Sequence, residues 1–151
     1  MGYNTYGTRH MPQVQELVRK EVEQCDQLGG LLLLQSMAGG TGAGLGARVA
    51  GALREEYESC PMLSCAVWPY ESGEVAVQAY NTMLTLSHIT EACDGVVLVE
   101  NEALHQQCRR ALLLDRPSYM DLNQVLARAL GSALAPARTV RTSTHSPQDD
   151  A

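Results

Sequence analysis

The chain has 151 residues, of which 45% are apolar, and its formal net charge is −6. This length is typical of one globular domain that can bury a core, and the acidic balance argues against non-specific binding to nucleic acid or to an anionic membrane. A small anionic ligand stays allowed, because backbone N–H groups can hold a phosphate without basic side chains.

In chain order, residues 1–10 are polar without a helical or strand period and predict a loop. Apolar positions then recur at helical spacing over residues 14–25, which predicts a surface helix that ends before a Gly-Gly pair. Residues 31–34 are four leucines and predict a strand buried on both faces. After a glycine run, the apolar positions of residues 45–57 step by four and predict a helix whose first turn is the run itself.

The same alternation continues, with strands expected at residues 62–67 and 95–99 and helices at 77–89, 101–112 and 118–133. Ser118 and Asp121 have the spacing of a capping box for the last helix. Repeated strand and helix order predicts an α/β fold, a mainly parallel sheet with helices on both faces. We expect this domain to span residues 1–135, and residues 136–151, rich in Thr, Ser, Pro and Asp, to form a polar disordered tail.

The cysteines and the hydropathy pattern bear on metal and membrane binding. Five cysteines are widely spaced, with no C-x-x-C pair and no Cys and His at zinc-ligand spacing, which predicts reduced thiols and no metal site. No apolar run approaches the roughly 20 residues that span a bilayer, and no leader pattern is seen at the N-terminus. We therefore expect a soluble, non-secreted protein without membrane contact. No side chain is assigned a catalytic role.

The glycine run of residues 38–46, placed between a strand and a helix, favours a phosphate site. The backbone can approach an anion closely where side chains are absent, and the helix dipole and first-turn N–H groups face it. The alternative is a tight turn whose glycines serve close packing only. A P-loop is excluded because no lysine follows Lys20. A dinucleotide fingerprint fits loosely, since the strand that ends near Trp68 lacks the carboxylate that would bind a ribose hydroxyl.

The glycine run resembles the G-G-G-T-G-S-G signature of the tubulin family, written here as Ala38-Gly39-Gly40-Thr41-Gly42-Ala43-Gly44. Residues 101–104 (N-E-A-L) and 116–123 (R-P-S-Y-M-D-L-N) resemble the segments that tubulins use on guanine. The sequences of residues 68–81 and 84–88 most resemble those of delta-type tubulins. The resemblance runs from about residue 2 to 134 and implies part of a Rossmann-like tubulin/FtsZ GTPase domain.

By this resemblance the cofactor is GTP. The resemblance implies phosphate contacts from Gly39, Gly40, Thr41, Gly42, Ala43 and Gly44, ribose contacts from Glu74 and Gln78, and guanine contacts from Asn101, Tyr119 and Asn123. The residue types suit these roles, because an amide offers a donor and an acceptor together and an aromatic plane suits a base. The alternatives are a helix cap for Asn101 and an ordinary core position for Tyr119.

Other parts of a tubulin nucleotide site are not found in this sequence, among them the acidic loops that contribute to the Mg²⁺ site. We therefore expect a truncated chain with an exposed hydrophobic sheet edge, weak GTP binding or none, and no hydrolysis by this chain alone. The resemblance implies other tubulins and microtubules as partners, and a place in the cytoplasm and cytoskeleton, at centrioles, basal bodies or cilia. The alternative functions are a dinucleotide-binding metabolic enzyme and a tubulin fragment that binds no nucleotide.

Overall fold

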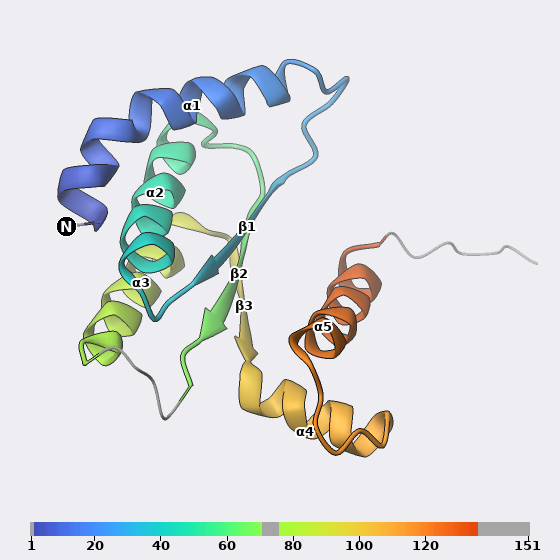
Figure 1. Cartoon of the computed structure of the whole chain (residues 1–151). Helices are drawn as coiled ribbons and strands as arrows, with labels where there is room; N and C mark the ends of the chain where they lie inside the picture. Colours follow the sequence, from blue (N-terminus) through green and yellow to red (C-terminus); the bar gives the residue numbers. More distant parts are fainter. Residues whose placement is uncertain (1, 71–75, 136–151) are drawn as a thin grey trace, which may run out of the picture.

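The computed structural model describes residues 2–70 and 76–135, and its elements follow the predicted alternation of strands and helices (Figure 1). The predicted site residue Glu74 and the predicted tail, residues 136–151, lie outside the described residues. The elements are the wide helical turns η1 (Gly2–Gly7) and η2 (Gly40–Leu45), the helices α1 (Thr8–Val22), α2 (Gly46–Glu56), α3 (Gln78–Ala92), α4 (Asn101–Ala111) and α5 (Tyr119–Leu134), and the strands β1 (Leu31–Ser36), β2 (Met62–Trp68) and β3 (Gly95–Glu100).

The three strands form one parallel sheet in the order β1-β2-β3, which confirms the predicted α/β class. Ser36 pairs with Val67, and Trp68 pairs with Glu100, so the carboxyl ends of all three strands lie at one edge. Parallel crossovers are right-handed, and two crossovers that run in the same direction place their helices on the same face. Accordingly, α2 and α3 lie together on one side of the sheet (Figure 1).

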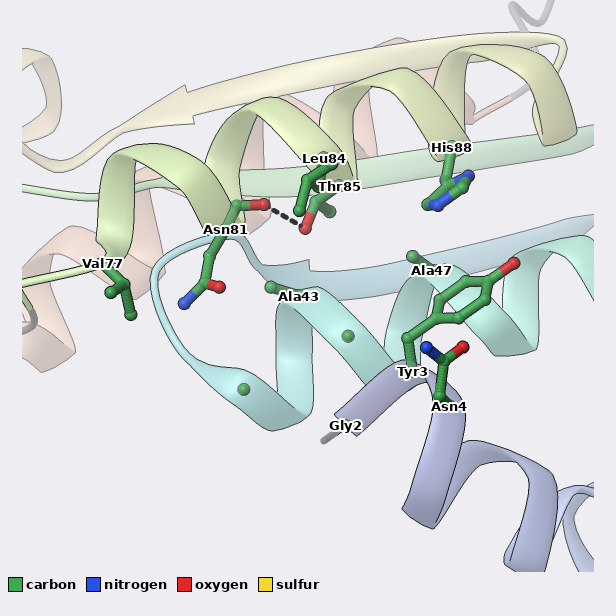
Figure 2. A pocket seen from close by; sticks show the side chains of 12 residues that line it. Gly2, Tyr3, Asn4, Ala43, Ala47, Val77, Asn81, Leu84, Thr85 and His88 are labelled. Atoms are coloured by element: carbon green, nitrogen blue, oxygen red, sulfur yellow. Dashed lines mark hydrogen bonds between the residues drawn. The ribbon is translucent and has the colours of Figure 1, made fainter.

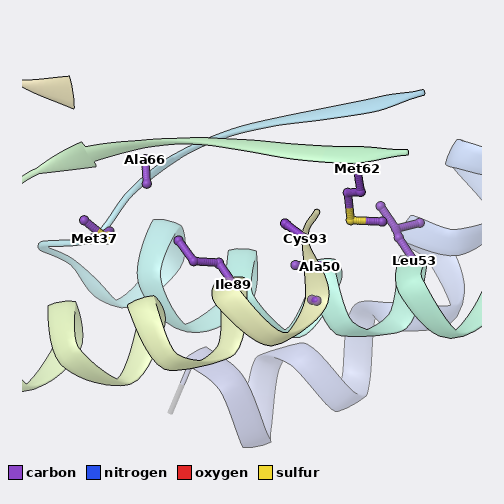
Figure 3. Packing of buried hydrophobic residues seen from close by; sticks show 8 residues of the cluster. Met37, Ala50, Leu53, Met62, Ala66, Ile89 and Cys93 are labelled. Atoms are coloured by element: carbon purple, nitrogen blue, oxygen red, sulfur yellow. The ribbon is translucent and has the colours of Figure 1, made fainter. Parts of the chain in front are cut away.

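The hydrophobic core lies between the sheet and the helices α2 and α3 (Figure 3). Its buried members are Met37, Ala50, Leu53, Met62, Ala66, Ile89, Ala92 and Cys93. Three of these are alanines, whose small side chains let the helices approach the strands closely. Helix α1 packs against α2, and its Val18 reaches the edge of this core.

The second face of the sheet is covered less completely, and the prediction that β1 is buried on both faces is wrong. Leu31 and Leu33 pack against the core, whereas Leu32 and Leu34 are 46% and 68% exposed. β1 is an edge strand, and helices α4 and α5 lie on the opposite side of the sheet from α1 to α3, near β3 (Figure 1). Val97 of β3 is also exposed on this second face. The sequence predicts an exposed hydrophobic sheet edge, and the structure exposes apolar side chains on a face of the sheet as well.

The predicted loop at the first ten residues is also wrong, because Gly2–Gly7 form the turn η1, which continues into α1. The cause is a tertiary contact that local sequence does not reveal. Gly2 packs directly on the backbone of Gly40 in η2, with no room for a side chain between them. Within the described residues, no helix has both the length and the apolar character needed to cross a membrane.

Candidate functional site

The predicted site residues that the structure describes lie at the carboxyl edge of the sheet or in the helices that follow it. Ligands of open parallel α/β sheets bind at this edge. Gly39 to Gly44 follow β1, Gln78 begins α3, Asn101 directly follows β3 and begins α4, and Tyr119 and Asn123 lie at the start of α5. The fold therefore directs the separate predicted segments toward one end of the molecule.

The glycines of the run have two different roles. Gly39 and Gly40 face open space, because a Cβ added at either would meet no atom within 4 Å. At Gly42 the added Cβ would lie 2.5 Å from the carbonyl oxygen of Ser36, and at Gly44 it would lie 2.9 Å from the amide nitrogen of Tyr3. No glycine among the described residues has a positive φ, so space rather than backbone conformation explains the run. Close packing thus explains the glycines at 42 and 44, whereas Gly39 and Gly40 leave room for a ligand.

The entry to η2 leaves its backbone donors without a side-chain partner. Gly39 is extended, with φ −102° and ψ −177°, and no side chain caps the turn that begins at Gly40. The first N–H groups of a helical segment have no intrahelical acceptor, and they attract an anion together with the helix dipole. The exposed Thr41 adds a hydroxyl beside them. This geometry suits a phosphate group.

Helix α3 holds the strand-to-loop connection in place. The Asn81 side-chain amide donates to the carbonyl oxygen of Ala38 at 3.0 Å, and the buried Thr82 hydroxyl lies 3.3 Å from the carbonyl oxygen of Met37. The Met37 amide in turn donates to Val67 of β2 at 3.1 Å. Sequence analysis did not single out Asn81, although its position one turn after Gln78 places it on the same helix end.

A cavity of about 620 Å³ opens beside the glycine run, between η1, α2 and α3. Gly40, Ala43 and Gly44 line it, and Figure 2 shows Tyr3 and His88 facing each other at one end. Their rings are stacked, with centroids 4.8 Å apart and planes 16° apart. Within the described residues, Asn101, Tyr119 and Asn123 are not among the residues that line this cavity.

The predicted guanine side is organised around Tyr70, which follows β2 and which sequence analysis did not single out. Its carbonyl oxygen accepts a hydrogen bond from the Gln78 side chain at 3.0 Å, and its ring lies 6.5 Å from that of His105 on α4. Burial and the neighbouring Tyr119, through charge and a side-chain hydrogen bond, raise the pKa of Tyr70. Tyr70 therefore holds Gln78, which the resemblance assigns to the ribose, and lies beside His105 of α4.

Both structural alternatives for the guanine residues are wrong. Glu100 occupies the N-cap position of helix α4, and its side chain makes no capping hydrogen bond. Asn101 is already the first helical residue. Tyr119 is 72% exposed and is no core aromatic. It begins α5 next to Ser118, which forms the predicted capping box with Asp121. Both candidate side chains are thus left for other contacts.

The residues present fit a nucleotide better than they fit a metal ion. Open backbone at Gly39 and Gly40 suits phosphate, and the exposed ring of Tyr119 suits a base. Across residues 2–70 and 76–135, no three His, Cys, Asp or Glu side chains cluster in a way that could hold a metal ion.

The sequence is similar to known proteins over almost its whole length. The model of the Tubulin/FtsZ family, GTPase domain, matches residues 1–109. The chain is 44% identical over 144 residues to a tubulin delta chain of Canis lupus familiaris and 43% identical over 144 residues to that of Homo sapiens, in each case over 95% of this chain and 32% of the relative. It is 38% identical over 130 residues to a tubulin beta-1 chain of Colletotrichum gloeosporioides, over 85% of this chain and 29% of the relative. The chain thus spans about a third of the length of these curated relatives.

Proposed function

This chain belongs to the tubulin/FtsZ family, with the delta chains among its relatives, and we propose that it forms one part of a guanine-nucleotide site. The observation that carries the proposal is the open backbone of Gly39 and Gly40 at the start of a helix, directly after a parallel strand. An anion there gains charge-assisted hydrogen bonds, each of about 1.5–3 kcal/mol. GTP supplies such an anion.

The remaining contacts are assigned by position. Gly39 to Gly44, including Thr41, are assigned to the phosphate side, and Gln78 to the ribose side, where Glu74 is proposed as its partner from sequence alone. Asn101 and Asn123 are proposed to form hydrogen bonds with the edge of the guanine base, and Tyr119 is proposed to stack on its face. The exposed side chain of Tyr119 supports this role.

Beyond nucleotide binding, we propose a cytoskeletal role. Other tubulins and microtubules are the proposed partners, and centrioles, basal bodies or cilia the proposed places, by relation to the delta chains. Nucleotide binding rather than hydrolysis is proposed for this chain, because no described side chain has an assigned catalytic role. A Mg²⁺ ion would enter with the nucleotide phosphates, and no described acidic cluster is assigned to it.

A titration of the ¹⁵N-labelled chain with GTP and Mg²⁺, followed by NMR, tests nucleotide binding directly. A partial site offers few contacts, and part of their free energy offsets the lost freedom of the ligand. We therefore expect a dissociation constant between about 0.1 and 1 mM, with signal changes at the Gly39, Gly40 and Asn123 amides. ATP should bind more weakly than GTP. A chain whose signals do not move with saturating GTP would contradict the proposal.

Two competitors are separated by the same titration. A dinucleotide-binding enzyme predicts that NAD moves the glycine signals more than GTP does, and a non-binding tubulin fragment predicts no movement with either. Gly40→Ala places a methyl group in open space on the ligand side, so it should keep the fold and weaken binding about tenfold, the loss of one contact of about 1.4 kcal/mol. Gly51→Ala is the matched control, because Gly51 also faces open space but lies in the middle of α2. It should leave GTP affinity unchanged.

A further inference from the structure

The connection after β1 is anchored to two different elements before the glycine run begins. The Met37 amide donates to the carbonyl oxygen of Val67 in β2 at 3.1 Å. The carbonyl oxygen of the next residue, Ala38, accepts a hydrogen bond from the side-chain amide of Asn81 in α3 at 3.0 Å. The Gly39 amide, which belongs to the same peptide group as this carbonyl, has no acceptor among residues 2–70 and 76–135. One end of the peptide group is thus held, and the other end is available to a ligand.

The peptide group between Ala38 and Gly39 transmits the position of Asn81 to that amide. No cis peptide bond occurs in the described part of the chain, and in a planar trans peptide the C=O and N–H groups point in opposite directions. A carbonyl group held by α3 therefore directs the Gly39 N–H away from α3. Gly39 faces open space, since an added Cβ would meet no atom within 4 Å. The direction of this donor is set before any ligand binds.

Asn81 is itself held in a defined place. Its backbone amide donates to the carbonyl oxygen of Val77 at 3.0 Å, and its carbonyl oxygen accepts a hydrogen bond from the Thr85 hydroxyl at 2.7 Å. Figure 2 shows its side chain pointing from α3 toward the turn that carries Ala43, and both residues line the same cavity. A fixed helical residue thus holds a connection that is about to enter a run of glycines.

We propose that Asn81 is a positioning residue, which fixes the peptide group between Ala38 and Gly39 so that the Gly39 N–H faces a phosphate of the nucleotide. The inference rests on the proposed guanine-nucleotide site. Glycine has more conformational freedom to lose than any other residue, so a donor on glycine binds more weakly unless its peptide group is already held. A neutral side-chain amide holds it without adding a charge beside the phosphate.

Two substitutions at Asn81 separate the donor from the space that it fills. Asn81→Leu removes the donor and keeps a side chain of similar length that favours helix, so α3 should stay formed. We expect the dissociation constant for GTP to rise about threefold to tenfold, because the ligand then has to order the backbone of one residue. Asn81→Gln keeps an amide, and the adjoining cavity of about 620 Å³ has room for the extra methylene group. Its dissociation constant should stay within about twofold of that of the original chain.

The matched control is Thr90→Val on the same helix. It removes a hydroxyl that donates to the carbonyl oxygen of Leu86 at 2.8 Å, so it also deletes a hydrogen bond from a side chain to the backbone. Thr90 is exposed and is not among the residues that line the cavity beside the glycine run. Thr90→Val should bind GTP as the original chain does.

A second readout needs no nucleotide and would not respond to a merely structural role. The ¹³C signal of a carbonyl group moves downfield when that group accepts a hydrogen bond, so the Ala38 carbonyl signal should move upfield in Asn81→Leu. In ¹⁵N relaxation, the order parameter of the Gly39 amide should fall from about 0.85 toward about 0.6 in the same variant. Asn81→Gln and Thr90→Val should leave both signals near their original values. A general loss of stability would lower the urea midpoint without changing these local signals of the folded protein.

The outcomes separate this inference from the proposed function. Absence of GTP binding by the original chain would overturn both. GTP binding by the original chain, with equal affinity in Asn81→Leu, would overturn the positioning role alone. Weaker binding in Asn81→Leu would also overturn it if the Ala38 and Gly39 signals were unchanged, or if Asn81→Gln or Thr90→Val bound equally weakly. Weaker binding in Asn81→Leu alone, together with the changed signals, supports it.

Discussion

Gly42→Ala is the substitution that most directly tests the packing of the glycine run. The added Cβ would lie 2.5 Å from the carbonyl oxygen and 2.9 Å from the amide nitrogen of Ser36, the last residue of β1. Both are backbone atoms, and Ser36 is held in register with Val67 of β2. A flexible side chain cannot yield there, so the strand end or the turn η2 has to move.

The expected cost follows from two opposing effects. Forcing an extra methyl group into a packed site costs about 1–3 kcal/mol. Replacing glycine by alanine in helical backbone returns up to about 1 kcal/mol. Because the Cβ would come within 2.5 Å of a backbone atom, we take the upper part of this cost, about 2–3 kcal/mol, so the net destabilisation is about 1–2 kcal/mol. Since 1 kcal/mol shifts the melting temperature of a domain of this size by about 2–4 °C, Tm should fall by about 2–8 °C.

Thermal and urea unfolding followed by circular dichroism at the helix band measures this effect. Gly51→Ala is again the control, because it has the same chemistry in helical backbone but meets no atom within 4 Å. It should raise stability by about 0.5–1 kcal/mol. If Gly42→Ala melts at or above the original chain, as Gly51→Ala should, the argument that Gly42 is required for packing is refuted.

Three further substitutions test other parts of the structure. The Met62 amide and then Arg54 lower the pKa of Asp94, so its contribution to stability is present at neutral pH and is lost as the pH falls from the ordinary carboxyl value of about 4 through the lowered one. Urea midpoints of the original chain and Asp94→Asn should therefore differ at pH 7, and the difference should shrink as the pH falls below about 4; a constant difference would contradict this. Ser118→Ala removes the capping box of α5 and should cost about 1 kcal/mol, measured by urea unfolding, with Ser132→Ala in the same helix as the control. Leu34→Gln changes an exposed leucine of β1 and should reduce aggregation in light scattering while unfolding free energy stays within about 0.5 kcal/mol; unchanged aggregation would argue against this face as its cause.

Local patterns predicted most of the fold. Residues 62–67 were predicted as a strand and form β2, Met62–Trp68, and the capping box at Ser118 was predicted from two residues alone. Both depend on neighbours in sequence, which is why they could be found. The four leucines of β1 could not reveal their own burial, because an edge strand and a central strand have the same run of apolar residues and differ only in their partners. Likewise η1 exists through its contact with η2, some forty residues away.

The candidate site, like the fold, could be predicted from the sequence only in part. The sequence identified the glycine run, but it could not say which glycines face a neighbour and which face open space. That distinction depends on Ser36 and Tyr3, which fill the space beside Gly42 and Gly44. Tyr70 was missed for a related reason, because its ring meets that of His105, 35 positions further along the chain, only in the folded protein. A single tyrosine after a strand has no pattern that marks it.

The first turn of α3 contacts both the connection after β1 and the connection after β2. Asn81 holds the carbonyl oxygen of Ala38, next to the open glycines, and Gln78, three residues earlier on the same helix, holds the carbonyl oxygen of Tyr70. Residues three apart on a helix lie on one face, so a displacement of this helix end would move the carbonyl groups of Ala38 and Tyr70 together. The spacing between these two connections is therefore set by one helix end rather than by two independent loops.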